Sequence, residues 1–323
     1  MCKINLKYFF ALLFVSLQIV ASSRLQVVGI LSVPKILDES QPNSYQSAAV
    51  NPSYVKWLEA SGAETLVIHP WNTPQEIADI LTKVNGILLQ GSLYKIDLYK
   101  DNPYLDRVMD ILDALSLKES GNKIPLIAID EGFILLHYIM AGKVDYSGNY
   151  EKFNRVSNLE FDLDRIKTAR MFSIFTEKDL NDVRTHPLTF SSNRSGISPS
   201  AYQENRRLRE YFRITSIIKD ENGKSSIASV EAYNHPIYAV QFRPDAISFT
   251  KDSNLNVPNS IEAIRAARAI GNFFIHDCKN NNKNILKESE YEKFSLIDSY
   301  NLTPFYDNIA DGFVYSFDKP TQI

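Results

Sequence analysis

The pattern of apolar and polar residues along the first half of the chain predicts short buried strands. Residues 25–33, 64–69, 86–89 and 125–129 form brief runs that are largely apolar and rich in β-branched side chains. Runs of this length and composition are typical of strands in a parallel sheet that is covered on both faces.

Helix signals lie between these runs. Asn51-Pro52 and Asn102-Pro103 each place a capping side chain before a proline at the first helical position. Thr73-Pro74-Gln75-Glu76 is a capping box. Residues 133–141 predict a helix directly after the strand at 125–129. Strands and helices in alternation favour an α/β fold, an open, mostly parallel sheet with helices on both faces.

The second half has a different pattern. Residues 212–219 and 226–232 predict an antiparallel β-hairpin, because the Asn222-Gly223 pair between them favours a turn with positive φ. Residues 236–242 predict another buried strand, and residues 261–278 a long helix. The polar tail that follows ends in an aromatic stretch, and no internal repeat is present.

The pattern of residues at the N-terminus predicts that the protein is exported. Lys3 and Lys7 precede an apolar run at 8–20, and the small residues 21–23 follow, as in a secretory signal peptide. An uncleaved anchor is the alternative, but the run is shorter than the about 20 residues that a membrane span needs. We expect residues 1–23 to be a signal peptide and residues 24–323 a single domain. The expected location is the secretory pathway, ending outside the cell or in a lysosomal or vacuolar lumen.

Composition and cysteine count narrow the class of protein. The chain has 323 residues, 44% hydrophobic and 23% charged, with a net charge of −3, which gives no reason to expect a nucleic-acid partner. Cys2 would leave with the signal peptide, so Cys278 is the one thiol of the mature chain and no internal disulfide can form. Cys278 lies late in a predicted amphipathic helix, where a packed thiol is expected rather than a nucleophile.

Three segments together resemble the γ-glutamyl hydrolase family. They are residues 53–64 (SYVKWLEASGAE), 84–92 (VNGILLQGS) and 231–245 (EAYNHPIYAVQFRPD). The tail at 287–306 is similar to the C-terminal extension of the same family. The resemblance implies a class I glutamine amidotransferase-like, flavodoxin-like fold and an activity that trims polyglutamate chains from folates, with no cofactor or metal.

The resemblance also assigns roles by position. The family uses a cysteine at a strand-to-helix elbow, a histidine base with an orienting acid, and backbone N–H groups that hold the oxyanion. The matching positions here are Asp130 for the nucleophile, Arg243 for the base and Asp245 for the acid. The oxyanion-hole and substrate positions are Gly91, Ser92, Glu131 and Asn193.

These replacements predict a protein that does not catalyse. Arginine stays protonated and cannot act as a general base, and none of the five histidines falls at the base position. The alternative is an active hydrolase with Asp130 as nucleophile, which would still need a base for its second step. We hypothesise that Asp130 and Arg243 form a charge-assisted pair; independent drift after loss of activity is the alternative.

Two glycosylation sequons and a basic cluster are further motifs, and they do not identify a single partner. Asn193-Arg194-Ser195 and Asn301-Leu302-Thr303 are glycosylation sequons, although a sequon in a polar loop also arises by chance. The basic cluster at 206–213 is expected to be a solvated surface, with an anion site as the alternative. A γ-glutamyl or folate-like small molecule, an unknown protein and a second copy of the chain remain candidate partners.

Overall fold

The computed structural model describes residues 25–36, 45–91, 103–116, 123–151, 153–192, 194–250, 253–280, 301–306 and 311–318. The predicted signal peptide lies outside the described residues, as do two of the predicted site residues, Ser92 and Asn193. Within the described part of the chain, no helix has the length and apolar character needed to cross a bilayer.

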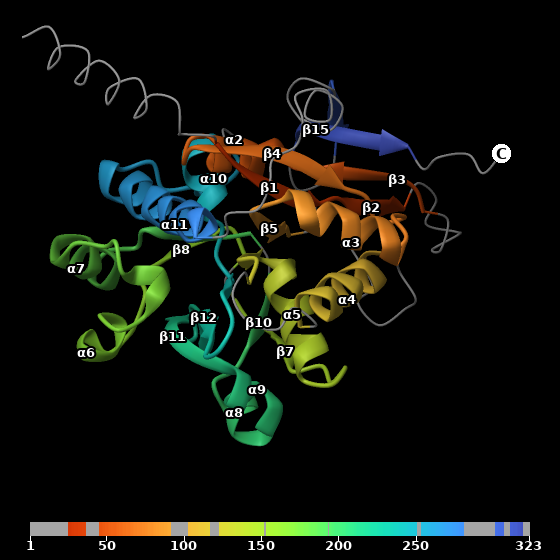
Figure 1. Ribbon diagram of the computed structural model, residues 1–323. Helices are drawn as coiled ribbons and strands as arrows, with labels where there is room; N and C mark the ends of the chain where they lie inside the picture. The colour runs from red at the N-terminus through yellow and green to blue at the C-terminus, as the bar shows by residue number, and fades with distance from the viewer. Residues whose placement is uncertain are drawn as a thin grey trace, which may run out of the picture.

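A seven-stranded sheet crosses the centre of the described part of the molecule (Figure 1). The outer two strands at one edge are antiparallel to their neighbours, and the other five run parallel. In order across the sheet the strands are β11 (Phe212–Lys219), β12 (Ser225–Ala232), β13 (Ile237–Val240), β6 (Leu126–Ile129), β5 (Gly86–Leu89), β1 (Gln26–Leu31) and β4 (Ala63–Ile68).

Helices cover both faces of this sheet, which confirms the predicted fold class (Figure 1). One face carries α2 (Pro52–Glu59), α10 (Pro244–Phe249) and α11 (Ile261–Lys279). The opposite face carries α3 (Pro74–Lys83), α4 (Pro103–Ser116) and α5 (Glu131–Met140). The helix starts follow the sequence signals, since Asn51 caps α2 and the Thr73–Glu76 capping box caps α3.

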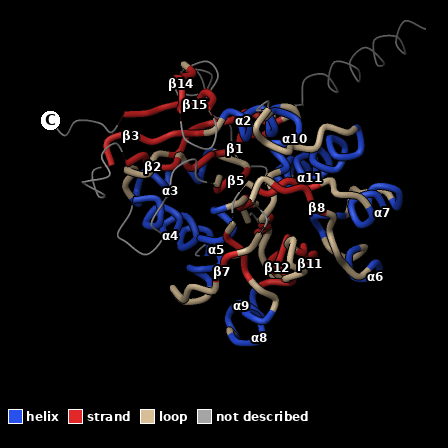
Figure 2. The backbone as a smooth tube through the Cα atoms, turned by 180° about the vertical axis from the view of Figure 1, so that it is seen from behind, coloured by secondary structure: helices blue, strands red, loops and turns tan. Residues whose placement is uncertain are grey.

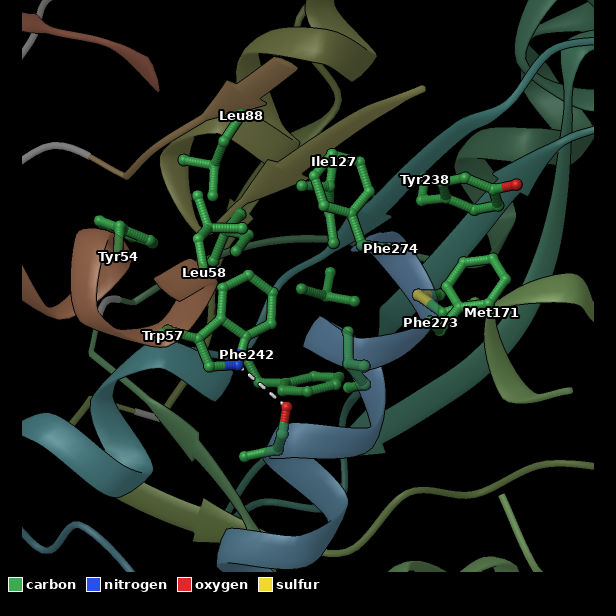
Figure 3. Close-up of a cluster of buried hydrophobic side chains, with 14 of the residues drawn as sticks. Tyr54, Trp57, Leu58, Leu88, Ile127, Met171, Tyr238, Phe242, Phe273 and Phe274 are labelled. Carbon is green, nitrogen blue, oxygen red and sulfur yellow. Dashed lines mark hydrogen bonds between the residues drawn. The ribbon is translucent and has the colours of Figure 1, made fainter. Parts of the chain in front are cut away.

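Successive side chains of the central strands point to opposite cores, as the strand period requires. In β6, Ile127 and Ile129 join the core under α2 and α11, while Leu126 and Ala128 join the core under α5. Figure 3 shows the first of these cores, where the Trp57 indole N–H donates to the Ala267 carbonyl at 3.0 Å. That bond ties α2 to α11, so both helices hold a fixed position beside the strand ends.

A second sheet was not predicted from the sequence. In order, its strands are β14 (Leu302–Tyr306), β15 (Asp311–Asp318), β3 (Tyr45–Val50) and β2 (Val33–Ile36). Figure 2 shows it at the opposite end of the molecule from the helices that precede β11. Phe317 of β15 is buried there, with its ring centroid 5.2 Å from that of His69. The C-terminal strands are therefore packed against the segment that connects β1 and β4 of the main sheet.

The segment between α5 and β11 supplies shorter elements, and the predicted hairpin of β11 and β12 is confirmed beyond it. Two short strand pairs lie in this segment. Its elements are β7 (Ser147–Asn149), β8 (Arg155–Ser157), α6 (Leu163–Ile166), the 3₁₀ helix η1 (Arg170–Phe172), α7 (Glu177–Thr185), β9 (Thr189–Ser191), β10 (Ser195–Ile197), α8 (Ser200–Glu204) and α9 (Arg206–Tyr211).

Candidate active site

Asp130 occupies a sharp turn between β6 and α5, at the carboxyl edge of the central sheet. Its backbone has φ 60° and ψ −116°, a conformation that side chains with a Cβ rarely adopt and that costs of order 1–3 kcal/mol. The Asp130 N–H donates to the Val240 carbonyl at 3.0 Å, and its carbonyl accepts from Phe133 and Ile134. The first residues of α5 and the neighbouring strand thus hold a strand-to-helix elbow in place.

Two glycines let neighbouring backbone approach the elbow. A Cβ on Gly132 would lie 2.4 Å from the Leu89 carbonyl oxygen, so α5 packs directly on the end of β5. A Cβ on Gly91 would lie 2.7 Å from the Asp130 Cβ. The Gly91 N–H donates to the Tyr54 hydroxyl at 3.0 Å. The predicted oxyanion position Gly91 therefore does lie against the elbow, and its N–H is bonded to a side chain of α2.

The Asp130 side chain is almost fully buried, with 2% of the residue exposed. Its Oδ2 accepts a hydrogen bond from the Ser192 hydroxyl at 2.9 Å. Ser192 directly follows β9 and was not singled out by sequence analysis. Glu131 is the first residue of α5 and is partly buried.

Arg243 lies beyond the end of β13 and is bonded to the predicted orienting acid. Its Nε donates to Asp245 Oδ1 at 3.2 Å and its Nη2 to Asp245 Oδ2 at 2.6 Å. Nη2 also lies 3.2 Å from the Ser53 hydroxyl. The guanidinium lies over the Tyr54 ring, with Cζ 4.9 Å from the ring centroid. The side chain is 10% exposed and that of Asp245 is fully buried. Asp245 is thus the hydrogen-bond partner of Arg243. The hypothesised pair of Arg243 with Asp130 stays a prediction, supported by the effect of the Asp130 charge on the pKa of Arg243.

Charge keeps Arg243 protonated in this position. Burial alone would lower the pKa of Arg243, but the negative charge of Asp245, with a smaller effect of Asp130, raises that pKa well above its ordinary value. Burial, opposed by Arg243, raises the pKa of the Tyr54 hydroxyl well above its ordinary value. Neither group can accept a proton at neutral pH.

Asp245 is also held from the side of α2. The Ser53 hydroxyl lies 2.5 Å from Asp245 Oδ2 and 2.8 Å from Asn51 Oδ1. The backbone N–H of Asn51 donates to Gln90 Oε1 at 3.1 Å, and Gln90 Nε2 donates to the carbonyls of Leu31 and Ala49. A continuous hydrogen-bonded path thus joins the Arg243–Asp245 pair to the second sheet. The sequence does not predict roles for Ser53, Tyr54 and Gln90, since these roles depend on contacts between segments distant along the chain.

The remaining candidates lie elsewhere. The buried His137 packs within the core, with Nδ1 2.8 Å from the Phe133 carbonyl and Nε2 2.7 Å from the Tyr202 hydroxyl. Burial lowers the pKa of His137 to about 4. Cys278 is fully buried, as expected, and burial raises the pKa of its thiol well above its ordinary value. Asn301 is exposed.

Three arginines of the basic cluster at 206–213 bond other residues of the same chain. Arg206 pairs with Glu210 at 2.6 Å, and Arg209 donates to the carbonyls of Tyr202 and Gln203. Arg213 lies 3.7 Å from Glu231. Within the described ranges, no group of three or more His, Cys, Asp or Glu side chains is placed to hold a metal ion.

The fold and the elbow define an α/β protein with a strained turn after a central strand and a carboxylate beyond the next one. The family model for Peptidase C26 matches residues 26–245. The chain belongs to the Peptidase C26 family, which confirms the family predicted from its three segments.

Curated relatives have names that agree with this assignment. Gamma-glutamyl hydrolase 2 of Arabidopsis thaliana is 28% identical over 283 residues, covering 87% of this chain and 78% of that protein. Gamma-glutamyl hydrolase B of Dictyostelium discoideum is 26% identical over 297 residues, covering 92% and 84%. The solved glutaminase domain of Trypanosoma brucei CTPS with bound acivicin has a TM-score of 0.48 at 14% identity, over 81% of this chain and 96% of that chain.

Proposed function

We propose that this protein is a non-catalytic member of the Peptidase C26 family, with a binding or structural role on a γ-glutamyl hydrolase scaffold. The observation that carries the proposal is the pairing of Arg243 with Asp245. The acid that would orient a base instead holds a guanidinium at 2.6 Å. A guanidinium cannot take a proton from a nucleophile or from water.

The elbow residue supports the same conclusion. Covalent amide hydrolysis needs a nucleophile, a base that activates it, and a base for the attacking water of the second step. At the elbow the nucleophile position carries Asp130, whose carboxylate accepts a hydrogen bond from Ser192. A carboxylate could attack without a base, but the water of the second step would still need one, and the base position carries Arg243. The ligands that we propose to test for retained binding are γ-glutamyl peptides and folate-like molecules, because the relatives are named for γ-glutamyl hydrolysis.

An active γ-glutamyl hydrolase is the second candidate. It is favoured by the backbone of Asp130, which keeps the strained elbow conformation at φ 60° although no cysteine stands there. In that case the Asp130 carboxylate would attack the amide carbonyl and form an anhydride as the C–N bond breaks. A general acid would have to protonate the departing amine, and a base outside the described contacts would have to activate the water that hydrolyses the anhydride. The curated relatives fit either candidate, since a shared fold does not determine activity.

The test is to restore the missing groups. Asp130→Cys with Arg243→His should give measurable release of glutamate from a poly-γ-glutamate substrate, while the starting protein and both single variants remain inactive. This result would mean that the scaffold is intact and lacks only its reactive groups. Equal activity in the starting protein and the double variant would contradict the proposal.

We further propose export through the secretory pathway, with residues 24–323 as one mature domain. The support is the charged, apolar and small-residue order of residues 1–23 together with the exposure of the sequon residue Asn301. Expression of the full chain in secretory cells should release a protein that starts near residue 24. A protein that stays inside the cell with residues 1–23 attached would contradict this.

A further inference from the structure

The Asp130 carboxylate is a buried charge at a site where any substrate of the elbow would have to sit. Removing a carboxylate from water is unfavourable unless hydrogen bonds and opposite charge compensate for it. With 2% of Asp130 exposed, the surrounding residues must supply that compensation. Contributions to that compensation come from Ser192, from Gly91, and from Arg243 together with the start of α5.

The first contribution comes from the segment that ends β9. Ser192 donates its hydroxyl to Asp130 Oδ2 at 2.9 Å. Two residues earlier, the Phe190 carbonyl accepts a hydrogen bond from the backbone N–H of Arg243 at 2.8 Å. One short segment thus bonds both Asp130 and the backbone of Arg243, which fixes the serine donor in position.

The second contribution comes from the loop after β5. A Cβ on Gly91 would lie 2.9 Å from Asp130 Oδ2, so a side chain there could not coexist with the carboxylate in its present place. Gly91 thus leaves room for the carboxylate of Asp130 against its backbone.

The third contribution is electrostatic, because the charge of Asp130 interacts favourably with the Arg243 guanidinium. Asp130 is among the charges that raise the pKa of Arg243, and the charges of Arg243, Asp245 and Asp130 all act on the Tyr54 hydroxyl. Asp130 also directly precedes α5, a helix of 10 residues, whose N-terminus favours negative charge nearby. Donor, space and potential therefore all suit one small anion.

We propose that the elbow is a carboxylate-binding site that the protein occupies with its own Asp130 side chain. The inference rests on the proposed function in one respect, that Asp130 is not a nucleophile. A substrate carbonyl that approached the elbow would meet a carboxylate already in place. When that side chain is removed, a small external carboxylate such as formate or acetate takes its position.

The experiment is rescue of Asp130→Gly by small anions. Glycine adopts φ 60° without strain, so this variant removes the carboxylate while keeping the turn. Melting temperature is measured at neutral pH in sodium formate, sodium chloride of equal ionic strength, and formamide, the neutral analogue of formate. Formate should raise the melting temperature of Asp130→Gly by several degrees over both references, because a ligand of the folded state stabilises it. It should not do so for the starting protein.

Two controls locate the effect. Asn154 also has positive φ, at 52°, so Asn154→Gly relieves the same kind of strain without removing a carboxylate and should show no preference for formate. Asp130→Gly with Ser192→Ala should bind formate at least several-fold more weakly than Asp130→Gly. Equal effects of formate and formamide on Asp130→Gly would overturn the proposal, and so would full rescue without Ser192.

If Asp130→Gly does not fold, the proposal is tested by acid unfolding of the Ser192→Ala variant of the otherwise unchanged protein. Loss of the donor makes the buried carboxylate easier to protonate, so the midpoint of acid unfolding should move to higher pH. An unchanged midpoint would overturn the proposal. The two failures are distinct, because the proposed function fails on turnover and this inference fails on anion binding or acid unfolding.

Discussion

The Arg243 guanidinium holds the Asp245 carboxylate at two points, with Nε–Oδ1 at 3.2 Å and Nη2–Oδ2 at 2.6 Å. Both side chains lie within one residue of the start of α10 at Pro244, and both are buried. Two-point pairing fixes the plane of the guanidinium as well as its distance. The geometry of this pair makes Asp245 a partner of arginine at the position where the family resemblance places an acid that orients a base.

Removing one member of this pair should be costly. Asp245→Ala leaves a buried guanidinium without its counter-charge, and we expect the free energy of unfolding to fall by about 3–5 kcal/mol. Replacement of both residues by apolar side chains, as in Arg243→Met with Asp245→Leu, should cost much less. The exposed pair of Arg206 and Glu210 provides the control, since Glu210→Ala should change stability little. Urea denaturation measures all three, and an equal loss for single and double variants would contradict the assignment.

Much of the fold follows from local sequence. The capping residues Asn51 and Thr73 and the Asn222-Gly223 turn act over a few residues, so the elements that they bound could be predicted. The elbow position followed from family resemblance, and the structure places Asp130 at such a turn. The second sheet could not be predicted in this way, because β3 is paired with β15, whose residues lie more than two hundred positions away in the sequence.

The details of the site depend on contacts that a sequence pattern does not contain. Arg243 has two carboxylates in its neighbourhood, and only side-chain packing decides that it bonds Asp245 while Asp130 accepts from Ser192. Gln90 follows a predicted strand, yet its role comes from three hydrogen bonds to segments that precede it by about forty to sixty positions. These choices are set by tertiary geometry.

Close packing at the elbow predicts the effect of a single methyl group. In Gly132→Ala the new Cβ would meet the Leu89 carbonyl oxygen at 2.4 Å, and backbone cannot easily move away. We expect a loss of about 2–3 kcal/mol in the free energy of unfolding. Gly148→Ala is the matched control, because its Cβ finds ordinary contacts at 3.6 Å or more. Similar stabilities of the two variants would show that α5 does not pack on β5 as described.

His137 predicts a pH dependence of stability. Burial lowers its pKa from 6.5 to about 4 in the folded protein, so the unfolded chain binds a proton at higher pH than the folded one. Stability is therefore lost as the pH falls from about 6.5 towards 4, by about 2 kcal/mol between pH 7.5 and pH 5 for this group. His137→Phe should remove that part of the slope, whereas Tyr202→Phe should keep it. Denaturation curves at the two pH values decide, and an unchanged slope in His137→Phe would contradict the burial of a neutral imidazole.

The C-terminal strands should contribute to the stability of the whole unit. Phe317 is 4% exposed and packs on His69, so Phe317→Ala should lower the free energy of unfolding by about 3–5 kcal/mol. Leu302 in the same sheet is 42% exposed, and Leu302→Ala should change it by less than about 0.5 kcal/mol. A single cooperative transition is expected in both. A separate early transition for Phe317→Ala would mean that the C-terminal strands unfold independently.

Loss of catalysis at the elbow is tested most directly by turnover of the unaltered mature protein. The protein is incubated with a poly-γ-glutamate substrate, and released glutamate is followed against Asp130→Asn, which keeps the size of the side chain and removes its charge. We predict no release above the uncatalysed background for either protein. Release by the unaltered protein that disappears in Asp130→Asn would show that the aspartate at the elbow acts as a nucleophile, and would contradict a non-catalytic role.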